Sequence, residues 1–150
     1  MSEAELAVVD ASVVLKWQFD DEDFVSQAIA LRDDYYARGA INLIAPQLLM
    51  YEVVNGVATA SRRNRIGVDK ADEAIGNLVA LGIELREVSP RRILEAALKY
   101  NLAAYDAAYL ALAEDENCDL WTGDRIFYQA VKHESGHVKW IGDYPSLASI

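Results

Sequence analysis

Four acidic residues stand at positions where a carboxylate is costly unless it has a partner. Asp10 follows the apolar run Leu6 to Val9, and Asp124 follows a second apolar run later in the chain. Glu52 lies on the apolar face of a predicted helix, and Asp106 opens a segment that is apolar almost all round. Burying an unpaired carboxylate costs on the order of several kcal/mol. These acids are therefore the first candidates for a functional site.

Binding of a hard divalent cation is the chemistry that would require such a set of acids. Carboxylates gathered at one place repel one another and raise each other's pKa unless a cation lies among them. The set offers oxygen donors and neither Cys nor His, so Mg²⁺ or Mn²⁺ is the expected ion. Such ions bind phosphate oxygens, activate a water and stabilise the leaving oxygen. They would also offset the acidic charge, so that a polyanion could enter.

Each acid, taken alone, also has a purely structural interpretation. Asp10 and Asp124 could cap the helices that follow them, and Asp106 could be a first-turn residue favoured by the helix dipole. Glu52 could pair with a buried Arg, although Lys and Arg are scarce in the apolar segments around it. The metal hypothesis therefore rests on the four acids together.

Alternating strands and helices are predicted to position these residues. Short segments rich in apolar residues predict strands at 6–9, 41–45, 119–122 and 137–141, and an alternation of apolar and polar residues predicts one at 83–88. Helical spacing predicts helices from Phe24 to Gly39, after Pro46 through Ala60, from Asp69 to Gly82, from Ser89, from Tyr105 to Asn117, and from Arg125 to His133. We therefore expect an α/β protein, a three-layer α/β/α sandwich with a mainly parallel sheet of about five strands. Ligands bind beyond the carboxyl ends of such strands, where Asp10 and Asp124 stand.

The apolar spacing also predicts which helix faces and which strand are covered. The helix with Asp69 as N-cap should turn inward Ala71, Ile75, Leu78 and Val79. The helix from Ser89 should turn inward Ile93, Leu94, Ala97 and Leu98. The strand at 83–88 alternates apolar and polar residues, which predicts a strand at the edge of the sheet.

Composition limits the class of protein. The 150 residues suit one domain spanning 1–150, and a hydrophobic content of 53% excludes a disordered chain. A formal net charge of −10 repels polyanions at long range, so any contact with nucleic acid should be local or assisted by a metal.

Cellular location is predicted from three features. The single cysteine, Cys118, excludes an intramolecular disulfide and fits a reducing cytosol. The acidic start, Met1 to Glu5, lacks the basic residues of a signal peptide. The richest apolar stretch, Leu102 to Ala113, is interrupted by Asp106 and is too short to span a bilayer. We expect a cytoplasmic protein without a membrane segment.

Two further patterns carry weaker signals. Arg62, Arg63 and Arg65 form the densest basic cluster, which is either a set of RNA phosphate contacts or a solvated helix end. The residues 133–137 spell the zinc-protease pattern, which needs both histidines on one continuous helix. Because Gly136 should end the helix and His137 should begin a strand, we do not expect a zinc site there.

At the acidic residues the chain resembles PIN-domain ribonucleases, and more closely the VapC-type toxins of toxin-antitoxin systems. The matching segments span nearly the whole chain in the order of the family, at 8–17, 45–55, 105–113 and 121–125. The resemblance implies a metal-dependent endoribonuclease whose acidic quartet is Asp10, Glu52, Asp106 and Asp124. It also implies that the hydroxyls of Ser12 and Thr122 support this quartet.

The same resemblance implies partners. Family members commonly form homodimers, and the toxins are held inactive by a cognate antitoxin that covers the acidic pocket. Some relatives carry a further acid or Asn just after the last Asp, whereas Arg125 and Ile126 follow Asp124 here. One or two ions per chain are therefore expected.

Two other functions are compatible with the pattern. A receiver-like or phosphatase-like domain would accept a phosphoryl group on Asp10, but the second acid of the phosphatase motif is missing. A non-catalytic PIN-like binding module would keep the acids as partner contacts.

Overall fold

The molecule is built on a sheet of parallel strands. The computed structural model describes residues 4–146, so most of the acidic start, Met1 to Glu3, lies outside the described residues. Within them the sheet has five strands in the order β3-β2-β1-β4-β5, and every pairing is parallel. The strands are β1 (Glu5–Val9), β2 (Ile41–Pro46), β3 (Glu84–Arg86), β4 (Asp119–Thr122) and β5 (Val138–Trp140). The predicted sheet is confirmed, with β3 at its edge.

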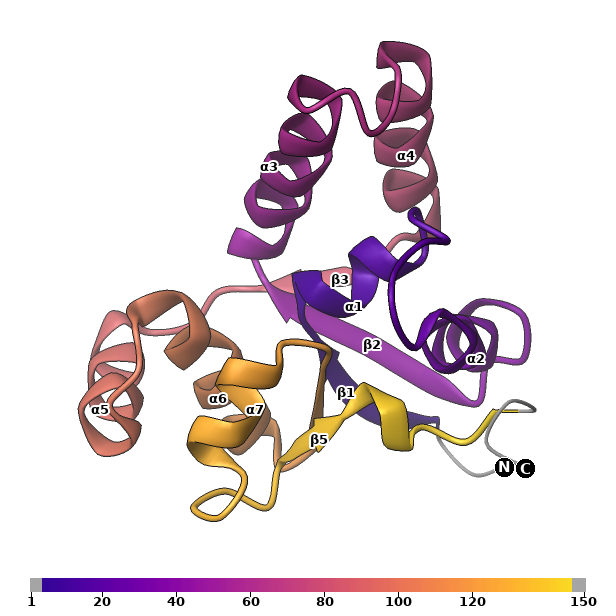
Figure 1. The fold of residues 1–150 in the computed structure, drawn as a ribbon. Coiled ribbons are helices and arrows are strands. Elements are labelled where there is room, and N and C mark those ends of the chain that lie inside the picture. The colour runs from indigo at the N-terminus through magenta and orange to yellow at the C-terminus, as the bar shows by residue number, and fades with distance from the viewer. Residues whose placement is uncertain (1–3, 147–150) are drawn as a thin grey trace.

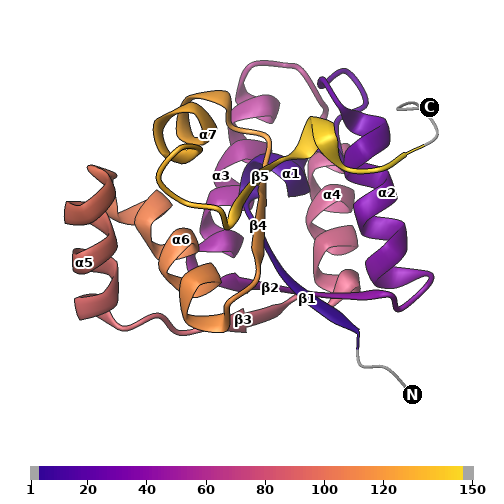
Figure 2. The same ribbon diagram turned by 90° about the horizontal axis from the view of Figure 1, so that it is seen from below.

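Helices cover both faces of this sheet. They are α1 (Ala11–Lys16), α2 (Val25–Tyr36), α3 (Leu48–Arg62), α4 (Val68–Leu81), α5 (Pro90–Tyr100), α6 (Ala104–Glu116) and α7 (Arg125–Val131), followed by a 3₁₀ turn, η1 (Ile141–Asp143). Figure 1 gives their arrangement, and Figure 2 shows α5 and α6 on one side of the strands and α2 and α4 on the other. The three-layer α/β/α prediction is confirmed.

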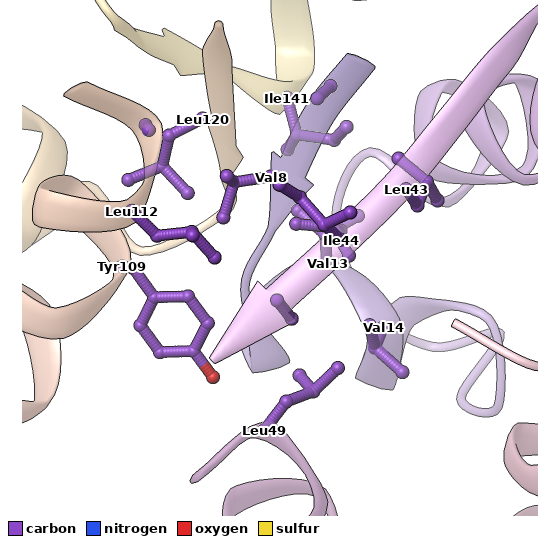
Figure 3. Close-up of a cluster of buried hydrophobic side chains, with 14 of the residues drawn as sticks. Val8, Val13, Val14, Leu43, Ile44, Leu49, Tyr109, Leu112, Leu120 and Ile141 are labelled. Carbon is purple, nitrogen blue, oxygen red and sulfur yellow. The ribbon is translucent and has the colours of Figure 1, made fainter. Parts of the chain in front are cut away.

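The core lies between β1 and the helices on its two faces. Val8 and Val9 are fully buried, as expected of a strand covered on both sides. On α6 every residue from Ala107 to Ala113 is buried, which confirms that this nearly all-apolar helix lies deep. Figure 3 shows side chains of β1, β2, α1, α3 and α6 meeting in this cluster.

The sequence patterns did not reveal α1. This helix has six residues, which is too short for a helical apolar period to stand out. It begins directly after β1, where the Asp10 carboxylate accepts a hydrogen bond from Val13 N at 3.3 Å. The buried side chains of Val13 and Val14 attach the helix to the core.

The start and one face of α4 differ from the prediction. The N-cap is Gly67, and Asp69 lies in the first turn of the helix. An acid in the first turn still interacts favourably with the helix dipole. Val79 was predicted to face inward, but its side chain is 61% exposed. Only the narrow stripe through Ala74 and Leu78 is buried, because α4 packs against its neighbours along one side.

The inward face predicted for α5 is wrong at two positions. Leu94 is 59% exposed and Leu98 is 75% exposed. Helix α5 packs mainly against α6, through the buried residues Ala96 and Tyr100. The other apolar side chains of α5 are therefore only partly buried. Taken alone, periodicity cannot tell which side of the helix has a neighbour.

A matched pair of leucine variants tests this assignment. Leu31 on α2 is fully buried, so Leu31→Ala should lower the free energy of unfolding by about 2–5 kcal/mol. Leu98→Ala should change it by less than about 0.5 kcal/mol, since the side chain is exposed. Urea denaturation measures both, and equal losses would contradict the described packing of α5.

None of the helices in the described part of the chain combines the length and the apolar character needed to cross a bilayer.

Candidate functional site

Two of the four acids lie at the carboxyl ends of adjacent strands. β1 and β4 pair in parallel, with Val9 opposite Trp121. Asp10 follows β1 directly, and its backbone N–H donates to the Trp121 carbonyl at 3.4 Å. Asp124 follows the end of β4 after a single glycine. The strand topology therefore brings these two acids to one edge of the sheet, as the sequence predicted.

Asp10 is the most buried of the acids. Its side chain is 7% exposed, and this loss of solvent raises its pKa to about 6 from an ordinary value of 3.8. Hydrogen bonds from Ser12, Thr122 and the Val13 amide partly counter the rise, while the charge of Asp124 adds to it. A buried carboxylate that is still repelled by a neighbouring acid is suited to receive a cation.

Two hydroxyls tie the turns that carry Asp10 and Asp124. Ser12 Oγ donates to Asp10 Oδ1 at 2.5 Å and accepts from the Gly123 backbone N–H at 2.7 Å. Thr122 Oγ1 accepts from the Asp124 backbone N–H at 3.0 Å and lies 3.4 Å from Ser12 Oγ. The two hydroxyls therefore link the β1–α1 turn with the β4–α7 turn. Their support of a functional site stays a prediction.

Asp106 and Glu52 reach the same region from two helices. Asp106 lies in the first turn of α6, partly buried, and its pKa is raised to about 6. Burial is the largest cause of this rise, and the charges of Asp124 and then Glu52 contribute the rest. Because Asp124 also acts on Asp10, electrostatic influence connects all four acids, which come from the β1–α1 turn, α3, α6 and the β4–α7 turn.

Tyr109 is a residue of this region that the sequence analysis did not single out. Its hydroxyl donates to Glu52 Oε1 at 2.6 Å, and its side chain is 2% exposed. Burial and the neighbouring Glu52 carboxylate raise its pKa, so the hydroxyl keeps its proton and remains a donor. Figure 3 shows the ring among aliphatic core side chains. The spacing of three residues from Asp106, which places both on one helix face, was the available signal.

The structural interpretations of the acids hold in part. Asp10 and Asp124 both cap helices, through Oδ1 bonds from Val13 N at 3.3 Å and from Phe127 N at 3.1 Å. Among the described residues Glu52 has no ion pair, and Tyr109 is its hydrogen-bond partner. A helix dipole would lower the pKa of Asp106, whereas burial and neighbouring acids raise it. Helix capping therefore explains the position of Asp10 and Asp124, and it uses one carboxylate oxygen of each. It does not explain why Glu52 and Asp106 lie in this region.

The chemical nature of the four acidic side chains suits the binding of a hard divalent cation. All four groups are carboxylates, and two of them have a pKa raised by burial and by neighbouring acids, which a cation would relieve. Within residues 4–146, no three Asp, Glu, His or Cys side chains are already spaced as ligands of a single ion. Side-chain rotation would therefore have to close the acids around an ion.

The basic cluster has a partly structural role. Arg65 pairs with Asp21 and with Glu22, the latter at 3.2 Å, and its guanidinium carbon lies 4.3 Å from the centroid of the Phe19 ring. These contacts tie the α3–α4 turn to the segment after α1. Arg62 and Arg63 are at the end of α3, and Arg63 is exposed. Contact of the three arginines with RNA stays a prediction.

The zinc-protease pattern does not form a helix. Helix α7 ends at Val131, before His133, and His137 directly precedes β5. His137 Nδ1 lies 3.0 Å from the Cys118 carbonyl oxygen. The two imidazoles therefore lack the one-turn spacing that the motif requires.

The chain is similar to proteins of one known family. Residues 7–132 match the family described as PIN domain. The chain is 34% identical over 124 residues to VapC ribonuclease Mb0985 of Mycobacterium bovis and to ribonuclease VapC9 of Mycobacterium tuberculosis, covering 79% of this chain and 86% of each relative.

Solved structures share the fold. PAE2754 from Pyrobaculum aerophilum superposes with a TM-score of 0.67 at 21% identity, covering 92% of each chain. Mycobacterium tuberculosis VapC20, a toxin that cleaves the sarcin-ricin loop, superposes with a TM-score of 0.62 at 16% identity, covering 93% of this chain and 99% of that one. The family match, the identity to VapC ribonucleases and the shared fold lead to one conclusion: the chain belongs to the PIN-domain family.

Proposed function

We propose that this chain is a divalent-metal-dependent endoribonuclease that hydrolyses RNA phosphodiester bonds. The observation that carries the proposal is the gathering of four acids, from four separate elements, at one edge of the sheet where their charges act on each other. Membership of the PIN-domain family and the similarity to VapC ribonucleases support RNA as the substrate.

Each acid has a proposed role. Asp10, Asp106 and Asp124 hold Mg²⁺ or Mn²⁺, one or two ions per chain, and Glu52 completes the shell or orients the attacking water. When bound, the ion supplies charge neutralisation at the phosphodiester and a lower pKa for the attacking water. Ser12 and Thr122 fix the turns that present Asp10 and Asp124, and Tyr109 fixes the Glu52 carboxylate.

Residues 1–150 form, in this proposal, one nuclease domain that acts as the toxin of a toxin-antitoxin pair in the cytoplasm. A cognate antitoxin would cover the acidic pocket, and the chain would form a homodimer. The similarity to VapC proteins supports these partners. Exposed apolar side chains such as Tyr51 and Tyr105 provide surface for such contacts.

The direct test is hydrolysis of labelled RNA by the purified chain in Mn²⁺. We expect internal cuts, mapped by the length of the labelled products, and growth arrest when the chain is expressed without an antitoxin. Intact RNA of every tested sequence and structure, at any Mn²⁺ concentration, would contradict the nuclease proposal.

One rival function has an observation in its favour. Asp10 and Asp124 cap helices, and the acids are not spaced as ligands of one ion, as a non-catalytic PIN-like binding module would allow. The same cleavage assay separates the two functions. Family membership favours both over the receiver-like or phosphatase-like alternative, which intact-mass analysis after incubation with a phosphodonor would detect.

Removing the Tyr109 hydroxyl should weaken the site without dismantling it. Tyr109→Phe deletes the bond to Glu52 Oε1, so the carboxylate loses its fixed orientation. Partners of this kind are worth about 10- to 100-fold in metal affinity. We expect the Mn²⁺ concentration for half-maximal cleavage to rise about tenfold, with a matching loss in calorimetric Mn²⁺ binding.

The chain offers a matched control for this variant. Tyr100 is also buried, and its hydroxyl donates to a glutamate, Glu114, at 3.0 Å on the α5–α6 contact. Tyr100→Phe should leave the Mn²⁺ dependence unchanged. Equal effects of the two variants would show that Tyr109 acts only through stability.

A further inference from the structure

The positively charged side chain of Arg125 lies beside the candidate site and has no role in the proposed metal binding. Arg125 follows Asp124 directly, and its guanidinium carbon lies 4.9 Å from the centroid of the Trp140 ring. Trp140 ends β5 and is in register with Thr122 at the end of β4. Because these strands are parallel and adjacent, the stacked pair stands at the same sheet edge as Asp10 and Asp124.

The indole is held in place from several sides. The Phe24 ring meets Trp140 edge-on, with centroids 5.5 Å apart and an interplanar angle of 80°. The Tyr128 ring lies 5.6 Å away at 39°. A Cβ at Gly142 would lie 2.5 Å from Trp140 Nε1, so the backbone also approaches closely. Trp140 is therefore a fixed support for the guanidinium.

The charge of Arg125 is not neutralised within the described residues. There, Arg65, Arg86 and Arg92 each pair with at least two carboxylates, whereas Arg125 has no ion pair and is exposed. A guanidinium held over an aromatic ring still has N–H donors free, and these suit the oxygens of a phosphate. In a chain of net charge −10, a fixed cation here is a favourable place for a polyanion to make contact.

We propose that Arg125, supported by Trp140, is a substrate-binding residue that contacts a backbone phosphate of single-stranded RNA next to the acidic site. The inference rests on the proposed nuclease function and adds a residue to its substrate contacts. Stacking on a fixed indole restricts the side chain before RNA arrives, so less conformational freedom is lost on binding. The contact is to the backbone, and it should depend weakly on base sequence.

The test compares Arg125→Ala with a control that removes the same charge elsewhere. The control is Arg91, which is exposed and lies far from the site. Its neighbour Arg92 pairs with Asp115, at the opposite end of α6 from Asp106. Binding of a fluorescein-labelled oligoribonucleotide is followed by anisotropy in the Asp10→Asn background, in which the RNA should stay uncut. KM and kcat for cleavage are measured in the wild-type background.

Arg125→Ala should raise the Kd about tenfold and reduce the salt slope by about 0.7, as expected for one lost phosphate contact to a single strand. KM should rise while kcat is kept, and Arg125→Lys should recover part of the binding because it restores the charge. Arg91→Ala should change the Kd less than about twofold. Unchanged binding in Arg125→Ala, or equal losses in Arg125→Ala and Arg91→Ala, would overturn the inference.

Failure of the nuclease function would look different. If the wild-type chain leaves RNA intact in Mn²⁺, the nuclease proposal fails. Binding that depends on Arg125 would then still support the phosphate contact. If the wild type cuts RNA and Arg125→Ala cuts it with the same KM, only the Arg125 inference fails.

Discussion

Asp10→Asn is expected to abolish RNA cleavage and to leave the fold intact. The substitution keeps the shape of the side chain and the capacity to accept the capping bond from Val13. It removes the charge that is most deeply buried among the four acids. Loss of about 4 kcal/mol of transition-state stabilisation, a size typical of metal-ion catalysis, lowers the rate about a thousandfold. Single-turnover cleavage of labelled RNA measures the effect.

Stability provides the control for this variant, and the sign of its pH dependence is fixed by the raised pKa. The folded state holds the pKa of Asp10 at about 6, above the ordinary value of 3.8, so the folded state prefers the protonated form. The stabilisation from that proton is present below about pH 4 and is lost as the pH rises through 6, by roughly 3 kcal/mol.

Asn carries no such proton, so metal-free Asp10→Asn should lack this part of the stability loss. In EDTA at pH 7 it should be at least as stable as the wild type in urea denaturation. Two results would contradict the account: undiminished cleavage by the variant, or an unfolded variant in EDTA at neutral pH.

Divalent ions are expected to stabilise the protein strongly at pH 7.5 and hardly at all at pH 5. Burial raises the pKa of Asp10 and of Asp106 to about 6, so both carboxyls are mainly protonated at pH 5 and an ion must displace their protons. At a free Mn²⁺ concentration one hundred times the Kd, binding adds about 2.7 kcal/mol to the free energy of unfolding. Thermal melts with Mn²⁺ and with EDTA measure the difference at each pH.

Cleavage should follow the same dependence on ions and pH. EDTA should remove it, added Mn²⁺ should restore it, and the rate at limiting Mn²⁺ should rise as the pH passes through about 6. The Asp10→Asn protein should show little stabilisation by Mn²⁺ at either pH. Equal stabilisation of wild type and variant, or full activity in EDTA, would place the ion outside the acidic quartet.

The sheet, and the edge of it that carries Asp10 and Asp124, followed from the sequence because both depend on local patterns. An apolar run that stops at an acid predicts a buried strand, and this held for β1. In β4 only Leu120 and Thr122 are buried, and a functional role for the two strand ends stays a prediction. Parallel strands then direct their ends to one edge, so the approach of Asp10 and Asp124 needed no knowledge of side-chain packing.

Features that depend on long-range packing were not predictable in the same way. The exposure of Leu94 and Leu98 depends on where α6 lies relative to α5, which the apolar period of α5 does not contain. The bond from Tyr109 to Glu52 joins residues 57 positions apart. Likewise, the stacking of Arg125 on Trp140 depends on the return of β5 beside β4. In each case the sequence shows both residues or elements, but it does not show that they meet in the folded protein.

Anomalous diffraction from a crystal soaked in Mn²⁺ would locate the ion. We expect a manganese peak at the carboxyl ends of β1 and β4, with oxygens of Asp10 and of at least two more of the four acids within about 2.2 Å of the ion. The Asp10→Asn crystal should lack this peak under the same conditions. A wild-type crystal with no manganese among these acids, or with manganese bound only elsewhere on the protein, would contradict this expectation.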